Sequence, residues 1–235
     1  LALASMLLAP QRSYAQDTAP AVAPAVAPAV APAVAPAVAP AAANGTTVDR
    51  DITTNTTWTK AGSPYNVASL IDVEAGATLT IEPGVTVQVG KASDPQWSYP
   101  FTIKGTLIAQ GTAAEPITFT GLTPAVGRWQ GLVVGNTEAQ PARATLDHVI
   151  IEYGGITNFG DTANLELHSA VADVNNSIFR NGSNYGVSVD FNTQLTLRNS
   201  NFTGNGVGAL IVDTIGPNFA LELGNLTASG NGVYD

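Results

Sequence analysis

From residue 46 onward, apolar and polar residues alternate in short runs that Gly and Asn interrupt. The runs 78–81, 85–89, 101–103 and 117–120 place every second side chain on one face, as half-buried strands do. No stretch of about 11 residues or more keeps the 3.6-residue period of an amphipathic helix. The pattern therefore predicts an all-β chain of many short strands.

The second half of the chain repeats itself at intervals that suit a solenoid. Asn176–Phe179 recurs 23 residues later as Asn199–Phe202, and Leu226 follows Phe202 in the same slot after 24 more. A period of about 22 to 26 residues is that of one turn of a parallel β-helix, in which the short strands of each turn stack on the next. We therefore expect about six or seven turns rather than a sandwich or a barrel.

Stacked turns place equivalent apolar residues in ladders along the core. One expected ladder contains Phe179, Phe202 and Leu226, and a second contains Val189, Ile211 and Leu223. Asn-Gly pairs follow each repeat, at residues 181–182, 205–206 and 231–232. Tight bends require positive φ angles, which Asn and Gly tolerate, so these asparagines are expected at corners.

The first 45 residues differ in composition from the rest. The apolar run 1–9 and the following Ser13-Tyr14-Ala15 are similar to the end of a secretory signal peptide, so residues 1–15 are interpreted as a signal peptide remnant of a secreted protein. Residues 16–45 contain five AVAP units, which predict a polyproline II linker. The β-helix domain is expected over 46–235, capped at 46–66, with its C-terminal end open or truncated.

Charge and cysteine content exclude several functions. The chain has 9 Lys and Arg against 18 Asp and Glu, which disfavours a nucleic-acid partner. It has no Cys, so it has no disulfide, thiolate metal site or Cys nucleophile. No apolar run reaches the roughly 18 residues of a membrane-spanning helix. No cofactor is expected; Ca²⁺ stays an alternative without a recognisable motif.

Three segments resemble successive turns of a known group. They are LTIEPGVTV at 79–87, IKGTLIAQGTA with PITFT at 103–120, and RWQGL at 128–132. These residues are similar to secreted bacterial right-handed parallel β-helix proteins of the pectate-lyase-like superfamily, over about residues 66 to 235. The resemblance implies a right-handed, single-stranded β-helix. It leaves the activity open, because the group includes adhesins, polysaccharide enzymes and other surface proteins.

The resemblance implies what an enzyme of this group would need. Its lyases use an Arg or Lys base with Ca²⁺-binding acids, and its hydrolases use clustered aspartates, but no matching motif occurs. The alternative catalytic set consists of Asp173, Asp190, Asp213, Arg180 and Arg198. Asp190 and Asp213 lie 23 residues apart, so we expect them on neighbouring turns, where solvated corner positions are the simpler interpretation.

The two histidines of the chain do not suggest a catalytic pair. His148 follows Asp147 in an expected strand, where adjacent side chains point to opposite faces and cannot form a dyad. His168 alternates with leucines and is expected to face outward. No HExxH or GxSxG motif occurs.

Aromatic side chains are the better candidates for ligand contact, because they stack on sugar rings. Trp97 and Tyr99 fall on an expected loop, and Trp129 and Tyr153 fall in other turns, with packing as the alternative for Trp129. We therefore expect a secreted structural or adhesive cell-surface module without enzymatic activity. Its expected partners are extracellular polysaccharide or cell-surface components, or further copies joined through open β-helix ends. The alternative is a polysaccharide lyase or glycoside hydrolase that acts in a groove of the β-helix.

Overall fold

The computed structural model describes residues 45–91, 99–155 and 162–232. The predicted signal peptide, almost all of the AVAP linker, and Trp97 lie outside the described residues. Within them, the secondary structure consists of short strands and one 3-10 helix, Lys60–Gly62. None of these residues belongs to a helix that is long and apolar enough to cross a membrane.

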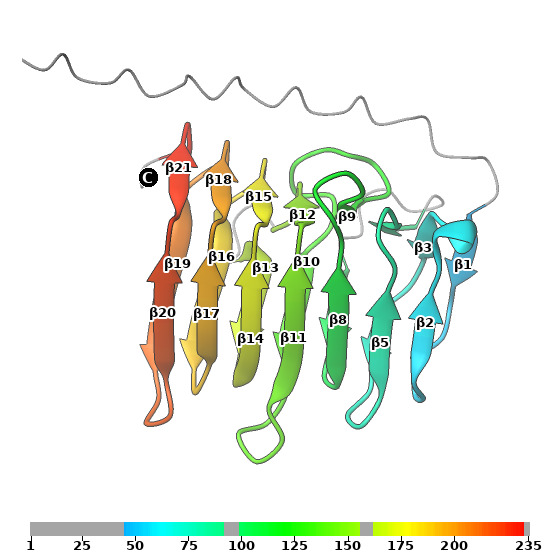
Figure 1. Cartoon of the computed structure of the whole chain (residues 1–235), viewed down its shortest axis with the longest axis horizontal. Helices are drawn as coiled ribbons and strands as arrows, with labels where there is room; N and C mark the ends of the chain where they lie inside the picture. The colour runs from blue at the N-terminus through cyan, green and yellow to red at the C-terminus, as the bar shows by residue number, and fades with distance from the viewer. Residues whose placement is uncertain (1–44, 92–98, 156–161, 233–235) are drawn as a thin grey trace, which may run out of the picture. The chain divides into compact units, whose positions relative to one another are not determined.

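The described strands form three sheets, here named A, B and C (Figure 1). Sheet A contains β1 (Thr46–Val48), β3 (Tyr65–Val67), β6 (Thr86–Val89), β9 (Ile117–Gly121), β12 (Val149–Glu152), β15 (Ile178–Arg180), β18 (Asn201–Thr203) and β21 (Thr227–Ser229). Sheet B contains β4 (Ile71–Val73), β7 (Pro100–Ile103), β10 (Gly131–Gly135), β13 (Ala163–His168), β16 (Tyr185–Phe191) and β19 (Gly208–Ile215). Sheet C contains β2 (Thr56–Trp58), β5 (Thr78–Ile81), β8 (Thr106–Gln110), β11 (Ala142–Asp147), β14 (Ala170–Asn175), β17 (Gln194–Arg198) and β20 (Ala220–Gly224).

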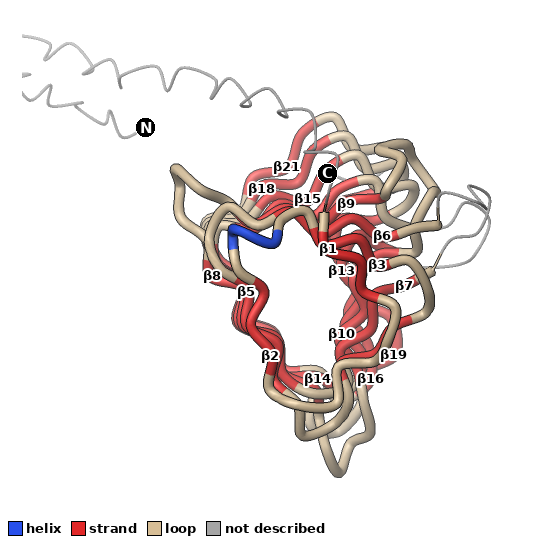
Figure 2. The backbone as a smooth tube through the Cα atoms, turned by 90° about the vertical axis from the view of Figure 1, so that its right-hand side faces the viewer, coloured by secondary structure: helices blue, strands red, loops and turns tan. Residues whose placement is uncertain are grey.

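The chain visits the sheets in a fixed cycle. From β4 onward it passes from sheet B to C to A and then begins the next turn, and from β2 onward each strand pairs in parallel with the third strand after it. Viewed along the stack, the three sheets enclose a common interior (Figure 2). The arrangement is a parallel β-helix of about seven turns, which confirms the predicted all-β solenoid.

In-register apolar residues fill the interior as continuous ladders. On sheet B, one ladder of fully buried side chains consists of Val73, Ile103, Val134, Leu167 and Val189. The predicted Phe179–Phe202 pair is confirmed, with ring centroids 5.1 Å apart. Each buried side chain of this size stabilises the folded state by roughly 1.5–3 kcal/mol relative to its exposure to water.

The predicted ladders are wrong in the last turn. Ala228, and not Leu226, lies opposite Phe202. Val212 lies opposite Val189, whereas Leu223 pairs with Leu197 in sheet C. The Ile211 assignment is one residue out of register, because the step from Val189 to its partner is still 23 residues. The turn lengthens after the irregularity between Val189 and Phe191, and the step reaches 26 residues at Leu197 and Phe202, so a constant period loses the register there.

The two ends of the described stack differ. The expected cap, residues 46–66, contains β1, β2 and most of β3. Trp58 stacks between Tyr65 and Phe101, with ring centroids 4.6 and 5.6 Å away, which fills the interior with aromatic rings. In the last turn, β21 is exposed along its whole length.

Candidate functional site

Corners between sheets C and A are built from residues with a left-handed backbone. His148, Asn176, Asn199 and Asn225 occupy successive turns with φ between 48° and 52°. Asparagine tolerates this conformation better than most residues, so the expectation that asparagines occupy corners is confirmed for Asn176, Asn199 and Asn225.

The prediction for His148 is wrong because the residue belongs to a corner. It lies between β11 and β12, where strand alternation no longer applies. Its Nδ1 atom comes within 3.0 Å of Oδ1 of the adjacent Asp147, although no hydrogen bond forms at that atom.

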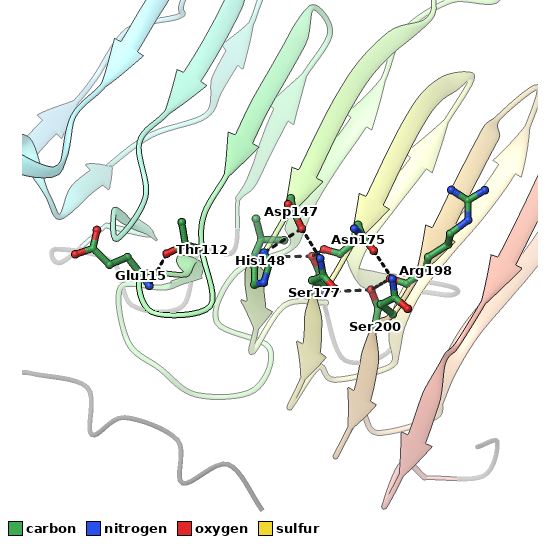
Figure 3. Close-up of polar contacts among 11 residues, drawn as sticks. Thr112, Glu115, Asp147, His148, Asn175, Ser177, Arg198 and Ser200 are labelled. Atoms are coloured by element: carbon green, nitrogen blue, oxygen red, sulfur yellow. Dashed lines mark hydrogen bonds and ion pairs between the residues drawn. The ribbon is translucent and has the colours of Figure 1, made fainter. Parts of the chain in front are cut away.

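Polar side chains link this corner from turn to turn (Figure 3). Nδ2 of Asn176 donates to Oδ1 of Asp147 at 2.9 Å, and Nδ2 of Asn199 donates to Asn175 at 2.8 Å. The Ser200 hydroxyl accepts from the backbone N–H of Ser177 at 3.2 Å. These hydrogen bonds between turns help to stabilise the stack.

A second polar ladder is buried near the corner between sheets A and B. Asn164 donates from Nδ2 to Oδ1 of Asn205 at 3.0 Å, and Asn205 donates to Asn231 at 2.9 Å. Oδ1 of Asn205 also accepts from the backbone of Gly182 at 3.0 Å. Asn164 and Asn205 are almost completely buried, so these amides replace hydrogen bonds to water with bonds between turns.

The alternative catalytic set does not form one site. Asp173 is exposed on β14 of sheet C. Arg180, on sheet A, donates from Nε to Glu152 of the preceding turn at 2.7 Å. Arg198, on sheet C, pairs with Glu222 of the following turn. Asp190 and Asp213 lie on neighbouring strands of sheet B, as their spacing suggested, and Asp173 and Arg198 lie on neighbouring strands of sheet C.

The described aromatic candidates are mostly packed. Trp129 is fully buried and its indole N–H donates to the Glu152 carbonyl at 2.9 Å, so its ring has no free face for a sugar. This corrects the expected ligand contact in favour of packing. Tyr153 occupies a corner with φ 61° and packs against the core. Tyr99 is half-buried before β7, and Trp97 lies outside the described residues.

The strongest cluster of ionisable groups lies on the outer face of sheet B. Leu165 and Leu167 of β13 are fully buried, so alternation turns Glu166 and His168 away from the core. Nδ1 of His168 lies 2.7 Å from both carboxylate oxygens of Asp190 on β16, and Nε2 lies 3.5 Å from Oε2 of Glu166. The predicted outward orientation of His168 is confirmed.

The environment changes the proton affinity of this cluster. The hydrogen bond with Glu166 raises the pKa of His168 above its usual 6.5, and the Asp190 charge adds to it, while burial acts in the opposite direction. Burial also raises the pKa of Asp190, and the negative charges of Asp213 and Glu166 act in the same direction. Together these effects outweigh His168, which lowers the pKa of Asp190. The imidazole of His168 therefore binds its proton more tightly than a free histidine side chain does.

Sequence reasoning named Asp190 but did not connect it with Glu166 and His168. The signal was present: Glu166 and His168 are two residues apart and share a strand face, and Asp190 follows His168 by 22 residues, which is one turn. No group of three or more His, Cys, Asp or Glu in the described ranges has an arrangement that could hold a metal ion.

Comparison with known proteins supports the fold and leaves the activity open. A family model described as "Pectate-lyase like beta helix domain" matches residues 50–200, which is more than half of the chain. Neither the curated proteins nor the solved structures contain a significant match. The chain belongs to the family of pectate-lyase-like β-helix domains.

Proposed function

We propose that this protein is a secreted structural or adhesive module that presents the outer faces of its β-helix to extracellular polysaccharide at a bacterial cell surface. One observation carries the proposal: polar side chains at the corners bond to the next turn, and the core ladders run through successive turns. Such a stack holds the surface residues of successive turns at fixed distances from one another. This arrangement suits multivalent attachment to a repeating polymer.

Of the predicted ligand-binding aromatic residues, Tyr99 is the one that we assign to attachment. It directly precedes β7 of sheet B and is half-buried, whereas Trp129 is fully buried and Tyr153 belongs to a corner that packs against the core. A tyrosine ring stacks on the apolar face of a sugar. A protein surface that binds a neutral, hydroxyl-rich polymer needs few charged side chains.

The test is a co-sedimentation assay of the full chain with insoluble polysaccharides, combined with measurement of released reducing ends and unsaturated uronides. We expect the protein in the pellet and no product above background. Tyr99→Ala should lower the bound fraction severalfold, and Ile215→Ala, which removes an exposed apolar side chain from β19, should not. Absence of binding to every polysaccharide would contradict the proposal.

A second candidate function is supported by the Glu166–His168–Asp190 cluster. A glycoside hydrolase or a polysaccharide lyase must move a proton at the scissile bond, and a histidine held between carboxylates is suited to this role. In that case His168 would be the group that exchanges the proton, and Asp190 would orient its ring.

The same assay separates the two candidates. If the protein is an enzyme, products accumulate in proportion to its concentration, and His168→Ala abolishes their release. His148→Asn is the matched control, since it removes the other histidine and keeps a residue that tolerates the corner. Product release that His168→Ala leaves unchanged would exclude this cluster as the catalytic site.

A further inference from the structure

We propose that protonated His168 holds the turn of β13 against the turn of β16 through its hydrogen bond to Asp190, and that loss of the proton weakens this contact. The His168–Asp190 pair is here named the clamp. The inference concerns the conformation of the β-helix and does not depend on whether the protein binds or cleaves polysaccharide.

The clamp spans two turns at adjacent strand positions. His168 is the last residue of β13 and lies in register opposite Asp190 of β16. Both Asp190 oxygens lie 2.7 Å from Nδ1, so a protonated imidazole donates a charge-assisted hydrogen bond between turns. The side chain of Asp190 is 13% exposed and that of His168 is 36% exposed, so the pair is partly shielded from solvent.

The neighbouring turn on the other side of β13 leaves space for the imidazole. Gly135 of β10 lies opposite His168, and a Cβ atom at Gly135 would come within 3.1 Å of the His168 Cβ and 3.6 Å of its Cδ2. The absence of a side chain at residue 135 therefore leaves room for the ring beside β10.

The described charges around His168 are mainly negative. Glu166 shares β13 and lies against Nε2, Asp190 faces Nδ1 from β16, and Asp213 follows on β19 close enough to raise the pKa of Asp190. Lys104, at the end of β7 on the same sheet, is held by Asp72 at 2.6 Å and Glu74 at 3.7 Å. A neutral His168 would leave Glu166, Asp190 and Asp213 together without their positive partner.

The direction of the pH effect follows from the raised pKa of His168. The folded state binds the His168 proton more tightly than the unfolded chain, so the clamp contributes fully below the unfolded pKa of about 6.5. Its contribution is lost as pH rises through the folded pKa. A neutral imidazole can still donate one hydrogen bond, so the link between the turns of β13 and β16 loses its charge assistance and is weakened. As a result β16 and β19 should open more often.

The first experiment is an NMR titration of the imidazole in the full chain. The protein has two histidines, so His148→Asn leaves only the His168 signal. We expect a midpoint above 6.5 that falls when Asp190→Asn is added. The matched control Asp173→Asn, at an exposed position on sheet C, should not move it. If His148→Asn does not fold, His168→Gln in the wild-type background assigns the two signals instead.

The second experiment measures amide hydrogen exchange of β16 against pH, corrected for the intrinsic pH dependence of exchange. Protection should fall as pH passes the measured midpoint, and His168→Gln should remove this step while leaving β5 and β8 unchanged. A His168 midpoint at or below 6.5, a midpoint insensitive to Asp190→Asn, or protection of β16 without a pH step would overturn the proposal. Failure of polysaccharide binding would not affect it.

Discussion

At the scale of single residues, backbone conformation at the corners decides which side chains the β-helix tolerates. His148, Asn176, Asn199 and Asn225 share a left-handed φ although one of them is a histidine. Sequence spacing predicted corners where Asn occurs, but it placed His148 in a strand, because the flanking apolar residues continue the alternation. Histidine gives no Asn-like signal, so its contact with Asp147 could not be predicted.

Substitution of His148 tests the corner. His148→Gly and His148→Val both remove the imidazole, but only valine is strained at a φ of 48°. We expect the valine variant to be about 1–2 kcal/mol less stable than the glycine variant, as measured by urea unfolding. Equal stability of the two variants would mean that residue 148 does not adopt the left-handed conformation.

Individual side-chain pairs within the core make larger contributions. Phe179 is fully buried and stacks on Phe202, whereas Ile178 on the same strand is half-buried. Phe179→Ala should lower the free energy of unfolding by about 3–5 kcal/mol, because it removes apolar contact and leaves a cavity. Ile178→Ala is the matched control, and an equally large loss in that variant would contradict the assignment of the inner face.

At the scale of strands and corners, stability depends on polar ladders that cross from one turn to the next. The Asn205 side chain is the central member of one ladder: it accepts from Gly182 and donates to the Phe179 carbonyl and to Asn231. Asn-Gly recurrence predicted that asparagines would be at corners. It aligned Asn181 with Asn205, whereas the hydrogen bonds place Gly182 beside Asn205 and Asn164 supplies the neighbouring amide.

Removal of the Asn205 amide tests this ladder. Asn205→Ala should cost at least about 1–3 kcal/mol, because the buried N–H of Gly182 loses its partner. Hydrogen exchange at Gly182 should accelerate in the variant. Asn218→Ala, at an exposed position between β19 and β20, is the control, and a similar destabilisation by both substitutions would argue against a special role for the buried ladder.

Strand existence was predictable to a much greater extent than strand register. Alternation located β5, β6, β7 and β9 because their inner residues are large and apolar. Register failed at β19 to β21, where the turn length changes. A period counted from sequence assumes equal turns, so one longer strand shifts every partner that follows it.

At the scale of the whole molecule, the described residues form one stack of about seven turns. On each outer face, residues paired in register form columns along the stack, to which each turn contributes one residue. The family resemblance and the period were sufficient to predict this architecture. The candidate site was not predictable as a unit, since Glu166, His168 and Asp190 join only when the register of β13 with β16 is known.

The distance between labels along one outer column tests the β-helix most directly. On sheet C, Thr57 begins a column in which Asp173, Thr196 and Glu222 lie four, five and six steps away. The chain has no Cys, so paired cysteine substitutions at Thr57 and each partner can be spin-labelled specifically. With a strand spacing of about 4.8 Å, double electron–electron resonance should give distances from Thr57 of ~19 Å to Asp173, ~24 Å to Thr196 and ~29 Å to Glu222. Distances that do not increase by one strand spacing per turn would contradict the parallel β-helix.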